Sequence, residues 1–185
     1  MDTHLIITKL VILKMKKIII LPLLLFTYFS IGQTSQKIYD IIDSVSAKRI
    51  EKDIQTLVSF GTRNTFSDTI SNTRGIGAAR RWIKSEFETI SKNCNNCLNV
   101  FYQKDFVTKE MGSRVPHDAW VVNVVAIQKG TKYPNRYIIM SGDIDSRASD
   151  TMDFTTDAPG ANDNASGMAG TIEAARVLSK YQFES

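Results

Sequence analysis

The sequence predicts an α/β fold: three layers, α/β/α, with a mixed β-sheet in the middle. Helical periodicity covers two long stretches, strand-like apolar runs follow them, and a final helical stripe closes the chain. The 185 residues are 43% hydrophobic and 23% charged, which is typical of a globular domain, and they show no internal repeat or low-complexity linker. A body of this size is long enough to bury a core.

The first 32 residues have the pattern of a secretory signal peptide. Met15-Lys16-Lys17 precede a short apolar run that Pro22 interrupts, and Ser30 and Gly32 place small residues before an expected cleavage at Gln33. Met15 is an alternative start. A membrane anchor is the competing interpretation, but the apolar run is short. We expect a leader over 1–32, a body over 33–185, a secreted or periplasmic location and no stable membrane association after signal removal.

Net charge and cysteine content limit the kinds of partner and metal site that the chain can have. The net charge is +4, but the leader holds four lysines and one aspartate, so the body carries 19 basic and 18 acidic residues. This balance argues against a nucleic-acid partner. Cys94 and Cys97 are the only cysteines. A lone C-x-x-C pair makes a poor zinc site, so we expect a local disulfide in an exported chain.

The elements follow from the spacing of apolar residues. One amphipathic helix, irregular in its middle, is predicted over about 36–58, and a second over about 74–91. Residues 98–107 and 119–128 are predicted strands, the second nearly all apolar. Residues 136–142 are predicted to form a further strand, with a buried run from Tyr137 to Met140. The last helix has a predicted buried stripe, made of Met168, Ile172, Ala175 and Leu178.

Carboxylates gather around the predicted strand end and the last helix. Asp143 and Asp145 follow the strand directly, and Asp163 stands at the expected helix start. Open α/β sheets bind ligands at the carboxyl ends of their strands, and clustered carboxylates repel unless a cation lies between them. A metal site is therefore one interpretation. Solvated turn residues are the other, because Asp and Asn favour loops for local hydrogen-bonding reasons.

Two motifs resemble a known family. The first is the strand that ends at Gly142-Asp143-Ile144-Asp145, and the second is Pro159-Gly160-Ala161-Asn162-Asp163-Asn164-Ala165-Ser166-Gly167, which precedes a helix with Glu-Ala-Ala-Arg. Together they resemble the zinc aminopeptidases of metallopeptidase family 28, which include leucyl aminopeptidase-like and aminopeptidase Y-like enzymes. The segments 60–65 and 74–83 extend the resemblance, so that it covers most of residues 46–181.

The resemblance implies a zinc-peptidase-like fold, two zinc ions and hydrolysis of amino-terminal peptide bonds in peptides or proteins. Asp163 corresponds to the carboxylate that bridges the two metals, and its peptide bond to Asn164 corresponds to a cis bond of the family. Asp145 corresponds to the catalytic-site aspartate that orients a histidine ligand. Asp143 stands where the family has that histidine, and its oxygen donors favour harder cations.

Other parts of the family's site have no counterpart in the sequence. A Glu-Glu pair, a further acidic ligand and a distal histidine lie downstream in the family, and Glu173 and Glu184 do not match them. We therefore expect 33–185 to be an amino-terminal part, catalytically incomplete as given. His117 is expected at the surface rather than on a metal, and a Ser-His-Asp triad lacks its serine elbow. Two alternatives remain: a non-catalytic exported module that binds a cation or partner, and a glutaminyl-cyclase-like acyltransferase.

Overall fold

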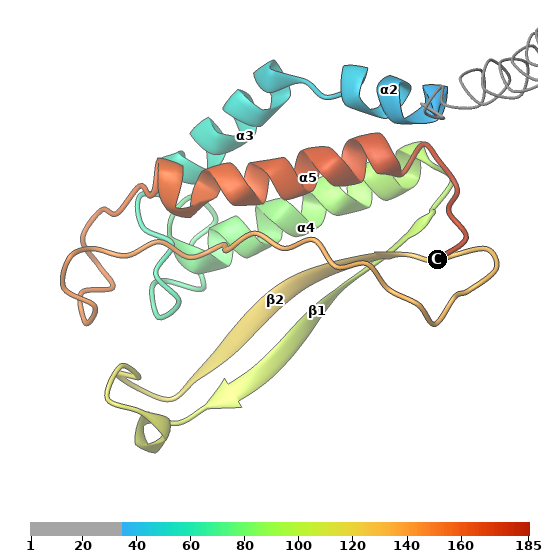
Figure 1. Cartoon of the computed structure of the whole chain (residues 1–185). Coiled ribbons are helices and arrows are strands. Elements are labelled where there is room, and N and C mark those ends of the chain that lie inside the picture. The colour runs from blue at the N-terminus through green and yellow to red at the C-terminus, as the bar shows by residue number, and fades with distance from the viewer. Residues whose placement is uncertain (1–34) are drawn as a thin grey trace, which may run out of the picture. The chain divides into compact units, whose positions relative to one another are not determined.

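Figure 1 shows a computed structural model, which describes residues 35–185. The predicted leader over 1–32 and its cleavage before Gln33 lie outside the described residues. The chain divides into two units, residues 1–40 and 41–185. The account below concerns the second unit, apart from helix α2 (Gln36–Asp43), which begins in the first. The described residues contain no helix that is long and apolar enough to cross a membrane.

The single helix predicted over 36–58 is two helices. Helix α2 ends at Asp43, and α3 (Ala47–Ser59) begins after a short break. Ser46 caps α3, because its Oγ accepts a hydrogen bond from the N–H of Arg49 at 3.3 Å. The N–H of Ser46 itself donates to Oε1 of Glu173 at 2.8 Å. The Ser46 cap and the hydrogen bond to Glu173 together fix the chain at this break, which coincides with the irregularity in the apolar spacing.

Helix α4 (Gly75–Asn93) forms where periodicity predicts it. The loop before it passes so close that a Cβ on Gly77 would lie 2.2 Å from the carbonyl oxygen of Thr69. Gly75 adopts a positive φ of 81°, which favours glycine. The start of α4 is therefore fastened to the 66–69 loop through backbone contact.

Strands β1 (Leu98–Val107) and β2 (Ala119–Gln128) form one antiparallel sheet, with Leu98 opposite Gln128 and Val107 opposite Ala119. The turn that leads from α4 into β1 is closed by a disulfide between Cys94 and Cys97, whose Cα atoms lie 5.4 Å apart. The sheet of the described residues has these two strands only. It is antiparallel, where a mixed sheet was predicted.

The strand predicted over 136–142 is wrong for the described chain. The segment runs back alongside β2 (Figure 1) but forms no ladder, and Ile138 and Ile139 are 87% and 85% exposed rather than buried. Its β-branched composition favours an extended backbone. A strand also needs a neighbour that supplies hydrogen bonds along its edge. No described strand forms ladder hydrogen bonds with this segment.

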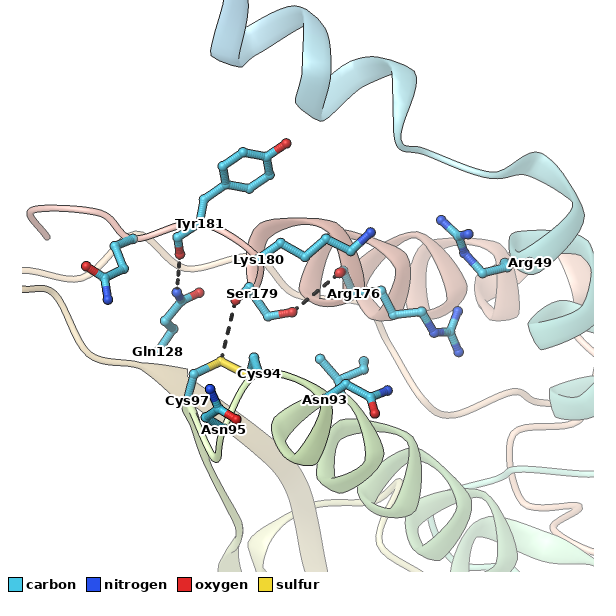
Figure 2. Close-up of a pocket in the computed structure, with 12 residues that line it drawn as sticks. Arg49, Asn93, Cys94, Asn95, Cys97, Gln128, Arg176, Ser179, Lys180 and Tyr181 are labelled. Carbon is cyan, nitrogen blue, oxygen red and sulfur yellow. Dashed lines mark hydrogen bonds between the residues drawn. A yellow bond between two sulfur atoms is a disulfide. The ribbon is translucent and has the colours of Figure 1, made fainter.

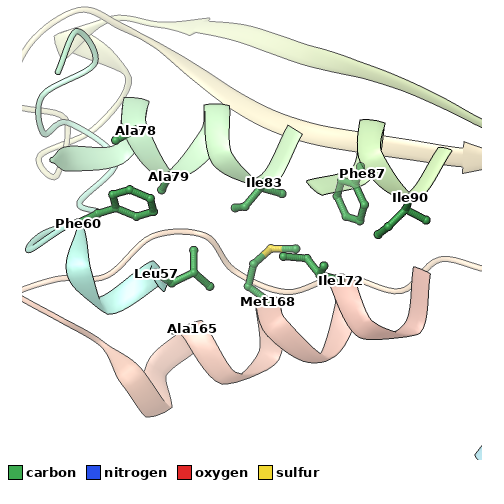
Figure 3. Packing of buried hydrophobic residues seen from close by; sticks show 10 residues of the cluster. All are labelled: Leu57, Phe60, Ala78, Ala79, Ile83, Phe87, Ile90, Ala165, Met168 and Ile172. Atoms are coloured by element: carbon green, nitrogen blue, oxygen red, sulfur yellow. The ribbon is translucent and has the colours of Figure 1, made fainter. Parts of the chain in front are cut away.

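The core lies between α3, α4 and α5 (Ser166–Leu178), as Figure 3 shows. Met168 and Ile172 of the predicted stripe are buried, whereas Ala175 and Leu178 are half-buried. Helix α4 packs on the sheet and against α5, which also contacts α3. A mixed α/β arrangement is thus present, and the described residues do not form the predicted three layers.

Candidate metal centre

Asp143 and Asp145 lie at one end of a long cleft. The cleft has a volume of about 1050 Å³ and is lined by every residue of 121–129 and of 136–145. We call it the β2 cleft. Both carboxylates are exposed, and Gly142 before them lies against the first turn of α5, where an added Cβ would be 2.7 Å from the Cα of Met168. The end of the extended segment therefore abuts the start of α5.

Asp163 is presented by the turn Ala161–Ala165, which leads into α5. The helix begins at Ser166, three residues later than the sequence predicts. The peptide bond between Asp163 and Asn164 is cis. Asn164 caps the helix, because its Oδ1 accepts a hydrogen bond from the N–H of Gly167 at 2.9 Å. The Asp163 side chain is exposed and is not needed for this cap.

Arg63 holds the two acidic segments together. Its side chain is fully buried and donates only to backbone carbonyls. Nε donates to Ile144 at 2.9 Å, Nη1 to Leu57 at 2.8 Å and to Pro159 at 2.7 Å, and Nη2 to Gly160 at 3.0 Å. Burial lowers the pKa of Arg63, and the nearby Asp145 carboxylate opposes this change. The guanidinium thereby fixes the backbone just before Asp145 and ahead of Asp163.

Ser146 completes this frame. Its Oγ donates to the carbonyl of Ala158 at 2.6 Å and accepts from the N–H of Arg63 at 2.9 Å. Ala158 also bridges to Thr62 in a parallel arrangement. Three chain segments that are far apart in sequence are therefore joined beneath the acidic residues.

Arg80 is a second buried arginine, on α4, and it lines the β2 cleft together with Asp143 and Asp145. It is 7% exposed, and its Nε has no hydrogen-bond partner in the described part of the chain. Burial lowers the pKa of Arg80, whereas Tyr102 and Asp145 raise it. Unlike Arg63, it is a buried cation whose donors are not fully used.

The other acidic residues of the 146–160 loop form hydrogen bonds or an ion pair with nearby residues. Asp150 accepts a hydrogen bond from the N–H of Met152 at 2.9 Å, and Asp157 pairs with Arg74 at 2.5 Å. Hydrogen bonds from Thr156 and Thr155 lower the pKa of Asp153. These carboxylates form turns and a surface ion pair, as loop aspartates commonly do.

The imidazole ring of His117 packs against two aromatic side chains. Its imidazole lies 5.6 Å from the centroids of both Phe66 and Phe154, edge-on to each. It therefore joins the β1–β2 connection to two neighbouring loops. His117 is exposed, as the sequence predicts.

A smaller cavity, of about 590 Å³, lies at the other end of α4 and α5 (Figure 2). The Cys94–Cys97 disulfide lines it, and Sγ of Cys97 lies 3.7 Å from the carbonyl oxygen of Ser179. Arg176 also lines it, but its guanidinium is paired with Asp53 and Glu86, at 2.6 Å each. The cavity is therefore lined by a disulfide and by an arginine that is already paired with two carboxylates.

Comparison with known proteins gives a family match over the part of the chain that contains Asp143, Asp145 and Asp163. Residues 123–185 match the description Peptidase family M28. The chain belongs to peptidase family M28. It is similar to probable zinc metalloproteases of Pyrenophora teres f. teres, with 46% identity over 145 residues, and of Leptosphaeria maculans, with 43% over 145. A third, from Pyricularia oryzae, is 40% identical over 137 residues.

These similarities cover most of this M28 chain but only part of each relative. They span 78%, 78% and 74% of the chain, and 30%, 33% and 27% of the three relatives. The chain therefore spans about a third of the length of the curated relatives it matches.

Among the described residues of this M28 chain, the set of candidate zinc ligands is incomplete. Zinc in proteins takes three or four side-chain ligands. In the part of the chain that the structure describes, His, Cys, Asp and Glu nowhere gather in a group of three that could hold a metal ion. Asp143 and Asp163 offer oxygen atoms only. The described residues do not by themselves hold zinc.

Sequence reasoning did not single out Arg63, Ser146 or Arg80. Arg63 stands in the 60–65 segment that contributed to the family resemblance, so its place in a motif was the available signal. Ser146 follows the acidic motif directly. Arg80 stands in the 74–83 segment of the same resemblance, but its burial was not expected, because an arginine inside a helix is usually exposed.

Proposed function

We propose that this M28 chain is part of an exported, zinc-dependent peptidase of the aminopeptidase type. The observation that carries the proposal is the meeting of two acidic segments. Gly142, just before Asp143, lies against the start of α5, and Asp163 is presented by the turn that enters the same helix. The names of the relatives, probable zinc metalloproteases, support zinc as the metal.

Each acidic residue has a distinct proposed role. Asp163 would supply the principal carboxylate to bound metal, and Asp143 would supply a further oxygen ligand. Asp145 orients that ligand, and Arg63, through its hydrogen bond to Ile144, holds Asp145 in place. The remaining ligands and the general base come from residues outside the described set, in a larger three-layer α/β/α domain.

Zinc, when bound in a peptidase, polarises the scissile carbonyl and activates water. The contribution of this chain is positional. Arg63 and Ser146 join the segments that carry Asp145 and Asp163. These hydrogen bonds hold the carboxylates in place against their mutual repulsion. A frame of buried hydrogen bonds is a stiff support for such a site.

The test uses the native polypeptide purified from its source. Its intact mass is compared with the 20.8 kDa of this chain, and zinc is measured by mass spectrometry. Recombinant Asp163→Asn should lose zinc and lose at least about a hundredfold in peptidase activity, since even residues behind metal ligands contribute 10–100-fold. Asp150→Asn, in an exposed turn, is the matched control. Free-amine substrates should be cleaved and N-acetylated ones should not.

A second candidate, a non-catalytic module that binds a cation or partner, is favoured by the incomplete donor set. It predicts a native mass no larger than 20.8 kDa, binding of calcium or magnesium rather than zinc, and no hydrolysis. Zinc binding with hydrolysis that depends on Asp163 would exclude it.

A further inference from the structure

The cavity at the ends of α4 and α5 has a size suited to a small molecule. Its volume of about 590 Å³ lies within the roughly 300–1,000 Å³ that ligand pockets usually have. We call it the disulfide cavity, because the Cys94–Cys97 bond lines it together with Ile90, which is buried. These groups give the cavity an apolar floor.

The walls of the disulfide cavity are held by hydrogen bonds on both sides. Nε2 of Gln128 donates to the carbonyl of Tyr181 at 2.6 Å, which joins the end of β2 to the chain that follows α5 (Figure 2). On the other side, Oγ of Ser91 donates to the carbonyl of Leu98 at 2.8 Å and accepts from the N–H of Leu98 at 3.2 Å. These bonds and the disulfide form the cavity without a ligand, as is usual for small-molecule sites.

The charged side chains that line the disulfide cavity are all basic. They are Arg49, Arg176 and Lys180, and among the described residues no aspartate or glutamate lines it. Arg176 already pairs with Asp53 and Glu86 behind the wall. The sign of the lining charge therefore favours an anion.

Arg49 and Lys180 keep donors available. Arg49 gives Nε and Nη2 to Glu173, and Nη2 also to the carbonyl of Ser44, whereas its Nη1 makes no hydrogen bond within the described part of the chain. Lys180 is exposed and forms no ion pair with any described residue. In Figure 2 the ammonium end of Lys180 points toward the side on which Arg49 lies. An anionic group in the cavity would give both cations a partner.

We propose that the disulfide cavity binds a small organic anion with an apolar body, such as a medium-chain carboxylate. Its acidic group would lie at Lys180 and at Nη1 of Arg49, and its apolar part would lie on Ile90 and the disulfide. The inference does not depend on zinc or on peptidase activity, because none of the acidic residues of the candidate metal centre lines this cavity.

Lys180 has a competing explanation that needs no ligand. It follows the C-terminal end of α5, where a cation interacts favourably with the helix dipole. This explanation predicts that the loss of Lys180 changes stability and leaves the binding of anions unchanged.

The first experiment titrates the 185-residue chain with octanoate, octylammonium, octanol and acetate in a calorimeter. We expect octanoate to bind at least about tenfold more tightly than the other three, because it alone has both an anionic group and an apolar body. Equal affinity for octanoate and octanol or octylammonium would overturn the need for an anion. Equal affinity for octanoate and acetate would overturn the need for an apolar body, and no binding of octanoate would overturn the site.

Lys180→Met tests the charged contact. It should weaken octanoate binding about fivefold and make the remaining affinity less sensitive to salt, because salt screens exposed charges. Lys92→Met, in the last turn of α4 but outside the cavity lining, is the matched control and should bind normally. If Lys180→Met changes the urea midpoint but not the affinity for octanoate, the helix-dipole explanation holds and the proposal is overturned.

A blocking variant tests the place of binding. Asn93→Trp puts a large side chain at a residue that lines the cavity and should abolish octanoate binding. Asn99→Trp, at an exposed position of β1 outside the lining, should not. In amide NMR spectra, octanoate should shift the signals of 90–97 and 176–182 and leave those of 140–146 unchanged. The opposite pattern would move the ligand to the β2 cleft and overturn the proposal.

The last measurement uses the native polypeptide purified from its source. It should show the same preference for octanoate over octylammonium and octanol. If the 185-residue chain binds octanoate and the native polypeptide does not, another part of that polypeptide covers the cavity, and the proposal is overturned for the complete protein.

Discussion

Arg63 and Ser146 are joined by reciprocal hydrogen bonds. The N–H of Arg63 donates to Oγ of Ser146 at 2.9 Å, and the N–H of Ser146 donates to the carbonyl of Arg63 at 3.3 Å. The loop after α3 and the segment that carries Asp145 therefore move as one piece. The spacing of Asp145 and Asp163 therefore depends on Arg63 and Ser146, neither of which is acidic.

Replacing Arg63 should unfold this frame. Arg63→Met keeps most of the volume but removes the side-chain donor from four backbone carbonyls, of which those of Leu57 and Gly160 keep a backbone N–H donor. We expect the free energy of unfolding to fall by about 3–5 kcal/mol, the usual cost of breaking a buried charged network. Urea denaturation measures it. Arg114→Met, at an exposed position, is the control. A loss below about 1 kcal/mol would show that the carbonyls find other partners.

Gly142 should tolerate no side chain. Gly142→Ala places a Cβ 2.7 Å from the backbone of Gly167 and Met168, whereas Gly112→Ala meets nothing within 4 Å. We expect the first variant to lose about 1–3 kcal/mol, as overpacked sites do, and the second to change little. Thermal unfolding compares the two. Equal midpoints would mean that the extended segment is not pressed against α5.

The buried Glu173 should make stability depend on acid. Burial by itself raises its pKa, but hydrogen bonds from Arg49 and from the Ser46 N–H outweigh this, so the pKa lies below its usual 4.5. A lowered carboxyl pKa contributes stability above about pH 4.5 that is lost as pH falls through the folded-state value. Glu173→Gln should lower stability at neutral pH and lose less on acidification.

Urea midpoints at neutral pH and near pH 3 measure this difference, with Glu51→Gln on the exposed face of α3 as the control. If Glu173→Gln and the unmodified chain lose the same stability on acidification, other carboxylates dominate the acid response.

The Cys94–Cys97 disulfide should have a modest effect on stability. It closes a loop with a sequence separation of 3, and short loops restrict the unfolded chain least. Cys94→Ala with Cys97→Ala should lower the free energy of unfolding by about 2 kcal/mol or less. Reductant should lower the unmodified chain to the same level and leave the double variant unchanged. A further drop of the variant in reductant would point to an effect unrelated to this bond.

The sequence predicts local structure well where local spacing decides it. The structure contains the predicted helix at 74–91 and the predicted strands at 98–107 and 119–128. Their apolar residues recur with the period of the element that they form. The predicted strand at 136–142 is absent, because its residues favour an extended backbone but no described strand forms hydrogen bonds with it. Composition cannot report whether a partner strand is present.

The candidate site divides in the same way. The cis bond at Asp163–Asn164 and the Cys94–Cys97 disulfide, both expected from motifs, are in the structure. The supporting role of Arg63 was not predicted, because it depends on hydrogen bonds to segments 81 to 97 residues away in the chain. Motifs identify the residues that face a ligand, whereas tertiary packing decides which residues hold them.

The ion network between α3 and α5 has a consequence for synthesis. Asp53 pairs with Arg176 across 123 residues, and Arg49 with Glu173 across 124. At a ribosomal rate of 5–20 residues per second, α3 emerges about 6 to 25 seconds before its partners. During that interval its charged groups and its apolar stripe are open to other molecules. The nascent chain is therefore a natural client for chaperones until α5 is made.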